Sequence, residues 1–164
     1  MTGFSQSQWL NSATVFLFAL LLCICVIDLK RMIIPNVLNA GLALSGLLIS
    51  VLILQNGFFS VVLQAIAMFA LFLGIAKFYV HLRNTQGLGG GDVKFLCAAT
   101  CWVGVLGLPW TLLIASLSGL TFALISHQMG KKMKAGQRLA FGPHLSLGLF
   151  VTWVMRDAIF NFPV

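Results

Sequence analysis

The chain has 164 residues, of which 60% are hydrophobic and 8% are charged, and its net charge is +7. Soluble domains usually carry about 25% charged residues, so a mean hydropathy of +1.02 excludes an ordinary soluble domain. Little polar sequence is left for a second domain, and residues 1–164 are therefore expected to form a single polytopic membrane domain.

The apolar runs, taken in chain order, predict an all-α integral membrane protein with about six transmembrane helices. A helix needs about 20 residues to cross a bilayer, and runs that are continuously apolar favour helices over a β-barrel. Pro35 is expected to separate the first two helices, whereas Pro109 and Pro143 suit the first turn of a helix. The runs cover residues 13–27 (extendable to 33), 37–54, 58–80, 92–108, 109–126 and 143–160.

The basic residues predict the orientation of these helices. The first run is interpreted as a retained helix, because no basic segment precedes it and no small-residue cleavage site follows it. Nine of the ten Lys and Arg residues lie around the connections after the first, third and fifth runs: Lys30, Arg31, Lys77, Arg83, Lys94, Lys131, Lys132, Lys134 and Arg138. The positive-inside rule assigns these connections to the cytoplasm, so both termini are expected outside.

Only three residues are acidic, and all three are aspartates. Asp28 and Asp92 lie at the ends of different apolar runs on the predicted cytoplasmic side, whereas Asp157 lies on the opposite side beside Arg156. Acids kept beside membrane segments are candidates for a functional site. Two carboxylates that share one proton can hydrolyse an amide, since one activates a water molecule and the other protonates the leaving nitrogen. Such a pair titrates as a unit, so neither aspartate is assigned as the acid or the base.

Structural roles for these aspartates stay open as alternatives. Asp92 follows three glycines and could be the N-cap of a helix, and Asp28 could pair with nearby basic residues. The glycines also favour the functional interpretation, because a backbone without Cβ atoms lets a substrate strand come close. The position of both acids on one side of the membrane favours a joint catalytic role.

Three segments resemble motifs of the type IV prepilin peptidases and occur in the order that this family shows. Residues 89–92 (Gly-Gly-Gly-Asp) resemble the GxGD motif. Asp28 followed by residues 34–36 (Ile-Pro-Asn) is similar to the other aspartate segment. Residues 141–143 (Phe-Gly-Pro) resemble the segment before the last helix. The combination is much more specific than GxGD alone.

The resemblance implies a GxGD aspartyl protease fold in the inner (cytoplasmic) membrane. It implies an endopeptidase that removes a short basic leader from prepilin or pseudopilin precursors at the cytoplasmic face, cutting after a glycine, with no cofactor. Asp28 and Asp92 would be the catalytic pair. The residues expected to bind substrate or to shape the site are Gly89, Gly91, Lys30, Pro35, Asn36, Lys94, Gly142 and Pro143.

The sequence also bears on related activities. Larger family members carry a segment with paired CxxC motifs and methylate the new N-terminus, and no CxxC occurs here. Peptidase activity without methyltransferase activity is therefore expected, as in the short members that serve Flp/Tad-type pilus assembly. The archaeal preflagellin peptidases remain a close alternative, whereas the Pro-Ala-Leu segment of presenilin-type proteases is missing.

The remaining polar groups favour plainer roles. The spacing of the four cysteines (Cys23, Cys25, Cys97 and Cys101) fits no common zinc pattern, so buried free thiols and no metal are expected. Lys30 and Lys94 could pair with a catalytic aspartate, contact acidic residues of the pilin, or extend to the membrane interface. His144 is left out of the catalytic set.

The basic loop around residues 131–138 is expected to touch anionic lipid of the bilayer, and nucleic acid is not expected as a partner. Two other functions are weighed against the peptidase. One is a small proton- or cation-coupled transporter, and the other is a non-catalytic membrane scaffold of pilus assembly. The oligomeric state is left open.

Overall fold

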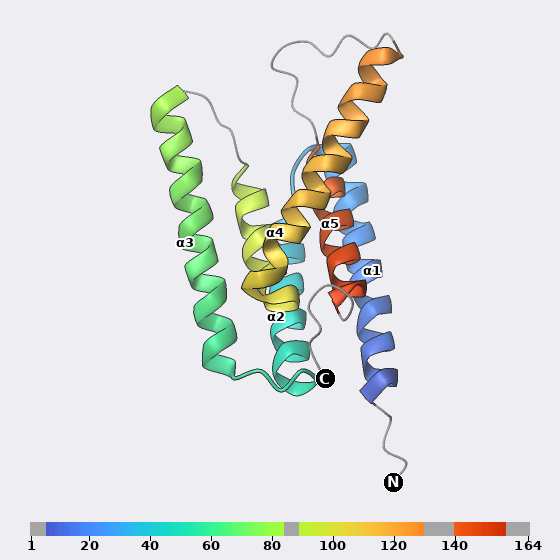
Figure 1. The fold of residues 1–164 in the computed structure, drawn as a ribbon, viewed down its shortest axis with the longest axis vertical. Coiled ribbons are helices and arrows are strands. Elements are labelled where there is room, and N and C mark those ends of the chain that lie inside the picture. Colours follow the sequence, from blue (N-terminus) through green and yellow to red (C-terminus); the bar gives the residue numbers. More distant parts are fainter. Residues whose placement is uncertain (1–5, 84–88, 130–139, 157–164) are drawn as a thin grey trace.

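A computed structural model describes residues 6–83, 89–129 and 140–156, and these residues form five helices and no strand (Figure 1). The expected all-α class is confirmed for this part of the chain. α1 and α3 rise toward the same end of the molecule, while α2 and α5 run the other way. The helices are α1 (Gln6–Arg31), α2 (Asn36–Leu52), α3 (Phe58–Arg83), α4 (Gly90–Gln128) and α5 (Gly142–Val154).

The expected count of six helices is not found, because the runs 92–108 and 109–126 both lie within α4. Two helices meet inside α4 at Gly104, whose backbone has φ 65° and ψ 179°. Figure 1 shows the yellow-green start of α4 descending and its orange end rising, so the chain turns back at this break. Pro109 lies inside the second half of α4, and the prediction that it begins a helix is therefore wrong.

Replacing Gly104 with alanine is expected to lower the free energy of unfolding. The backbone angles of Gly104 lie in a region that is essentially restricted to glycine, and holding another residue there costs about 1–3 kcal/mol. The matched control is Gly74→Ala in α3, where an added Cβ would meet nothing within 4 Å and helix propensity favours alanine. Thermal unfolding in detergent measures both variants. Equal melting temperatures for Gly104→Ala and Gly74→Ala would contradict the backbone strain expected at position 104.

Pro35 and Pro143, the other two prolines within the described residues, lie where the sequence predicts. Pro35 is the N-cap of α2, with an extended backbone, and separates it from α1. Pro143 lies in the first turn of α5. The last run was expected to reach residue 160, but α5 ends at Val154. Residues 157–160 lie outside the described part of the chain, as do Asp157 and the basic loop 131–138.

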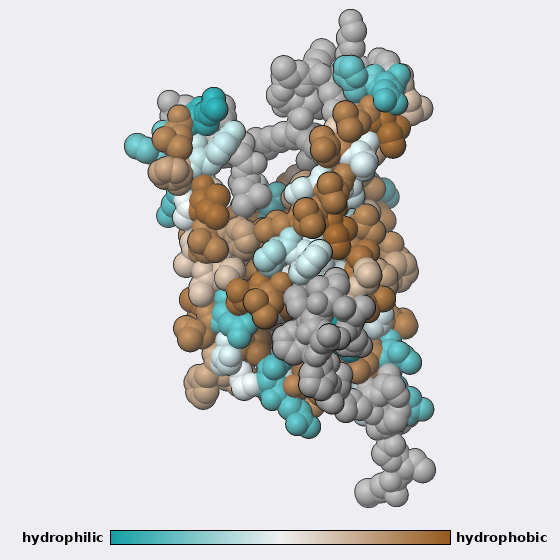
Figure 2. Space-filling view, viewed as in Figure 1, coloured by the Kyte–Doolittle hydropathy of each residue, from teal (hydrophilic) through white to brown (hydrophobic). Residues whose placement is uncertain are grey.

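The chain is a membrane protein by the length and composition of its helices. Among the described residues, three segments are long and apolar enough to cross a bilayer: Gln8–Arg31, Phe58–Arg83 and Gly90–Gln128. Hydrophobic side chains cover much of the visible surface (Figure 2), and Phe59 and Leu63 on α3 are 86% and 69% exposed. An exposed apolar surface of this extent suits contact with lipid rather than water.

Two tryptophans join four of the helices in the core. The rings of Trp102 (α4) and Trp153 (α5) pack edge to face with their centroids 5.1 Å apart. The indole N–H of Trp102 donates to the Leu42 carbonyl on α2 at 2.8 Å. The indole N–H of Trp153 donates to Thr14 Oγ1 on α1 at 2.9 Å. This core ties the first half of α4 to α2 and α5, and it ties α5 to α1.

Candidate active site

Asp28 lies near the end of α1 and is only 4% exposed. Its Oδ2 accepts a hydrogen bond of 2.8 Å from the backbone N–H of Gly142, the first residue of α5. The first N–H groups of a helix have no partner within the helix. The Asp28 carboxylate accepts a hydrogen bond from one of these unpaired N–H groups at the start of α5. This contact joins the first aspartate segment to the Phe-Gly-Pro segment.

Gly142 leaves no room for a side chain beside Asp28. A Cβ on Gly142 would lie 2.6 Å from Asp28 Oδ2 and 2.8 Å from Cγ. The carboxylate therefore occupies the space that any other residue would need. Only glycine at position 142 lets the N–H approach this closely.

Asp92 is the third residue of α4 and is half-buried. The N-cap of this helix is Gly89, whose carbonyl accepts the Asp92 N–H at 3.0 Å. The alternative in which Asp92 is itself the N-cap is therefore wrong. A Cβ on Gly89 would lie 3.0 Å from Asp92 Oδ2, so the carboxylate turns back toward the glycines that precede it.

The two carboxylates are close enough to interact electrostatically. Asp28 comes from α1 and Asp92 from α4, and the fold brings both to the region where α5 begins. Like charges in a poorly hydrated place are unfavourable unless the pair shares a proton or meets a cation. The arrangement is suited to general acid and base chemistry.

The start of α2 forms a third side of this region. The side-chain oxygen of Asn36 accepts a hydrogen bond from Lys94 Nζ at 2.7 Å. One helical turn later, Asn39 Nδ2 donates to the Gly91 carbonyl at 3.3 Å. The sequence did not mark Asn39. A second asparagine three residues after Asn36, and thus on the same helix face, is the sequence signal that could have identified it.

The other predicted residues lie around these contacts. Lys30 is exposed at the end of α1, and Pro35 and Pro143 are half-buried. A Cβ on Gly91 would lie 3.4 Å from Ile34 Cβ, so the glycine motif packs against the segment just before Pro35. Lys94 is engaged by Asn36 rather than by an aspartate.

His144 occupies a packed position behind the first turn of α5. Its Nδ1 lies 3.0 Å from Ser118 Oγ on the second half of α4. Its ring lies against Phe122 and Phe141, with centroids 5.8 Å and 6.2 Å away. These contacts are those of a residue that holds α5 against α4, and they agree with leaving His144 out of the catalytic set.

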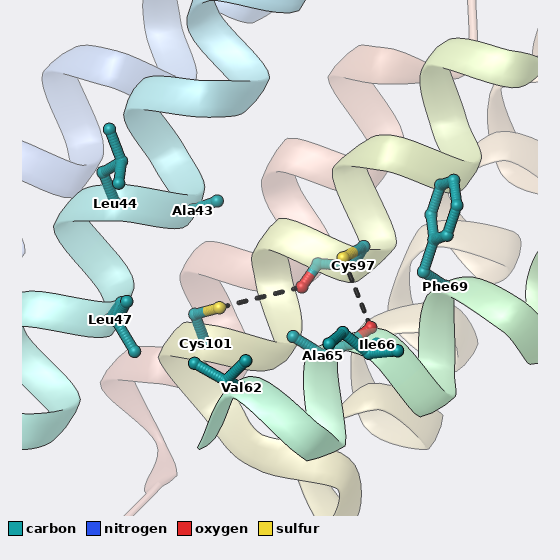
Figure 3. Close-up of a pocket in the computed structure, with 9 residues that line it drawn as sticks. All are labelled: Ala43, Leu44, Leu47, Val62, Ala65, Ile66, Phe69, Cys97 and Cys101. Carbon is teal, nitrogen blue, oxygen red and sulfur yellow. Dashed lines mark hydrogen bonds between the residues drawn. The ribbon is translucent and has the colours of Figure 1, made fainter. Parts of the chain in front are cut away.

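The cysteines are less buried than expected. Cys101 is buried, Cys25 and Cys97 are half-buried, and Cys23 is exposed, because the outward faces of the helices are apolar and meet lipid rather than protein. Cys97 and Cys101 line an apolar pocket of about 240 Å³ between α2, α3 and α4 (Figure 3). Cys97 Sγ donates to the Ala65 carbonyl at 3.3 Å. Within the described ranges, no three His, Cys, Asp or Glu side chains gather into a possible metal site.

Comparison with known proteins shows the family to which this chain is similar. Residues 15–124 match the type IV leader peptidase family, a range that includes Asp28 and Asp92 and stops before Gly142. Its curated relatives include proteins named prepilin leader peptidase/N-methyltransferase. The protein of Pectobacterium carotovorum subsp. carotovorum is 35% identical over 137 residues, which are 82% of this chain and 48% of that protein.

The relative in Escherichia coli (strain K12) is 30% identical over 141 residues, which are 86% of this chain and 62% of that protein. The relative in Neisseria gonorrhoeae is 27% identical over 157 residues, which are 94% of this chain and 52% of that protein. The chain thus spans about half the length of the curated relatives it matches. No solved structure matches the chain.

Proposed function

Because the chain belongs to the type IV leader peptidase family, we propose that it is a membrane aspartyl endopeptidase. Its substrates would be prepilin or pseudopilin precursors, from which it removes the short basic leader. The observation that carries the proposal is the electrostatic interaction between Asp28 and Asp92, each of which lies against a glycine where a Cβ would crowd its carboxylate. Residues 1–164 would act as one membrane domain.

In the proposed reaction, a water molecule held between the two carboxylates attacks the scissile carbonyl. One carboxylate takes the proton of the water and the other gives a proton to the leaving amide nitrogen. The Gly142 N–H fixes the orientation of Asp28. Gly89 and Gly91 would let an extended substrate backbone approach Asp92.

We further propose that this site faces the cytoplasm in the inner membrane. The ends of α1 and α3, which carry Lys30, Arg31 and Arg83, lie toward the same end of the molecule as the start of α4 (Figure 1). Basic residues of this kind mark the cytoplasmic side. If the two halves of α4 count as separate crossings, the chain crosses the membrane six times and both of its ends lie outside.

The proposal is tested by mixing the purified protein in proteoliposomes with a precursor that has glycine before the cleavage point. We expect the leader to be removed after that glycine, as mass spectrometry of the product would show, with no methyl group added to the new N-terminus. A precursor without that glycine serves as the control. An intact precursor in the presence of folded protein would contradict the peptidase, and proton flux in the same vesicles would favour a transporter.

A further inference from the structure

Asn39 is a buried amide with only one of its polar atoms in use. The residue is 5% exposed, and its Oδ1 has no hydrogen-bond partner among the described residues. Leaving a buried acceptor unpaired is costly. A leucine has the same branched shape and would fill the space without that cost, so packing alone does not account for an amide here.

The one hydrogen bond that the Asn39 side chain makes among the described residues is not needed by its acceptor. Asn39 Nδ2 donates to the Gly91 carbonyl, and Gly91 is the second residue of α4. A carbonyl in this position already accepts the N–H four residues later in the helix. The bond from Asn39 is therefore an additional one, and its effect is to hold the first turn of α4 against α2.

This bond is the inner one of two. Asn36 and Asn39 lie three residues apart on one face of α2. Asn36 bonds Lys94, and Asn39 bonds Gly91. These two partners are likewise three residues apart on α4. The outer bond, between Asn36 and Lys94, is exposed, whereas Asn39 is enclosed. The inner bond ends on the residue directly before Asp92.

We propose that Asn39 is a positioning residue for Asp92. Its amide fixes the Gly91 carbonyl and thereby the turn from which the Asp92 carboxylate projects. This inference rests on the proposed peptidase function. Small displacements of a catalytic group have large effects on rate, since a shift of about 1 Å can cost roughly 100-fold.

The first test is Asn39→Leu, which keeps the shape of the side chain and removes both the donor and the unpaired oxygen. We expect a melting temperature in detergent close to that of the wild type. We expect kcat for precursor cleavage to fall about 10- to 100-fold while KM stays within about 3-fold. A purely structural residue would give the opposite pattern, with lower stability and unchanged kcat. Wild-type kcat in a folded Asn39→Leu protein overturns the proposal.

A second pair of variants isolates the hydrogen bond from packing. Gln and Met have nearly the same length and shape, but only Gln keeps a side-chain amide that can donate to the Gly91 carbonyl. Asn39→Gln is therefore expected to keep at least about 5-fold more activity than Asn39→Met. Equal activity of the two overturns the proposal. It is also overturned if none of the three variants folds, because Asn39 is then a residue required for folding.

Two further proteins separate this inference from the function on which it rests. Asn56→Leu removes an exposed amide just beyond the other end of α2, which donates to Ser50 Oγ at 3.0 Å, and it is expected to stay within about 2-fold of the wild type. Asp92→Asn is expected to be inactive. If Asp92→Asn still cleaves the precursor, the proposed function fails. If it is inactive while Asn39→Leu matches the wild type, only the positioning role fails.

Discussion

Changing either Asp28 or Asp92 to asparagine is expected to stop cleavage of a prepilin precursor, with a rate loss of at least about 10³-fold. An asparagine has nearly the same shape as aspartate, but it can neither accept a proton from water nor return one to the leaving nitrogen. The variant at position 28 still has a side-chain oxygen that can accept the Gly142 N–H. Its fold should therefore be kept, and the time course of leader removal reports on chemistry alone.

The third aspartate provides the matched control for this experiment. Asp157 is the remaining acid of the sequence and is expected on the far side of the membrane, so Asp157→Asn should cleave at the wild-type rate. All variants are compared at equal amounts of inserted protein. The shared-proton pair is wrong if Asp28→Asn or Asp92→Asn, correctly inserted, processes the precursor normally.

Gly142→Ala is expected to have the second largest effect, with activity falling roughly 100-fold. The new Cβ would lie 2.6 Å from Asp28 Oδ2, and the buried carboxylate has little space to withdraw. Either α5 or Asp28 must move, which breaks the hydrogen bond that orients the acid. Crowding of a packed interior typically costs about 1–3 kcal/mol of stability, so the melting temperature should also fall.

Gly41→Ala controls for the general effect of adding a methyl group to a packed helix. A Cβ at position 41 would meet only Leu20 Cδ1, at an ordinary contact distance of 3.7 Å. Cleavage by this variant should stay within about 2-fold of the wild type. If Gly142→Ala behaves in the same way as Gly41→Ala, the close approach of Gly142 to Asp28 has no part in the site.

The sequence predicted the residues at the site better than it predicted the elements that carry them. Asp28 and Asp92 were recognisable because acids are rare in this chain, because glycines precede Asp92 and because an Ile-Pro-Asn segment follows Asp28. The contact between Asp28 and Gly142 could not be predicted, because the residues around each of them do not indicate that the two meet. Their catalytic roles stay a prediction.

The break in α4 could not be read from hydropathy. Residues 92–126 are apolar almost throughout, and the boundary between two helices was therefore predicted at Pro109. The chain instead reverses at Gly104, a single glycine within an apolar run, whose positive φ is visible only in three dimensions. Asn39 was missed for a related reason. Its spacing from Asn36 places it on the same helix face, but the carbonyl that its side chain meets is visible only in the structure.

The hydrogen bond between Asp28 and Gly142 spans 114 residues of sequence, and this separation sets an order of events during synthesis. Asp28 leaves the ribosome early, whereas the glycine that orients it is made only when the last described helix begins. A partly synthesised chain therefore holds both aspartates but not the complete site. The proposed active site is complete only once the chain has been made as far as Gly142.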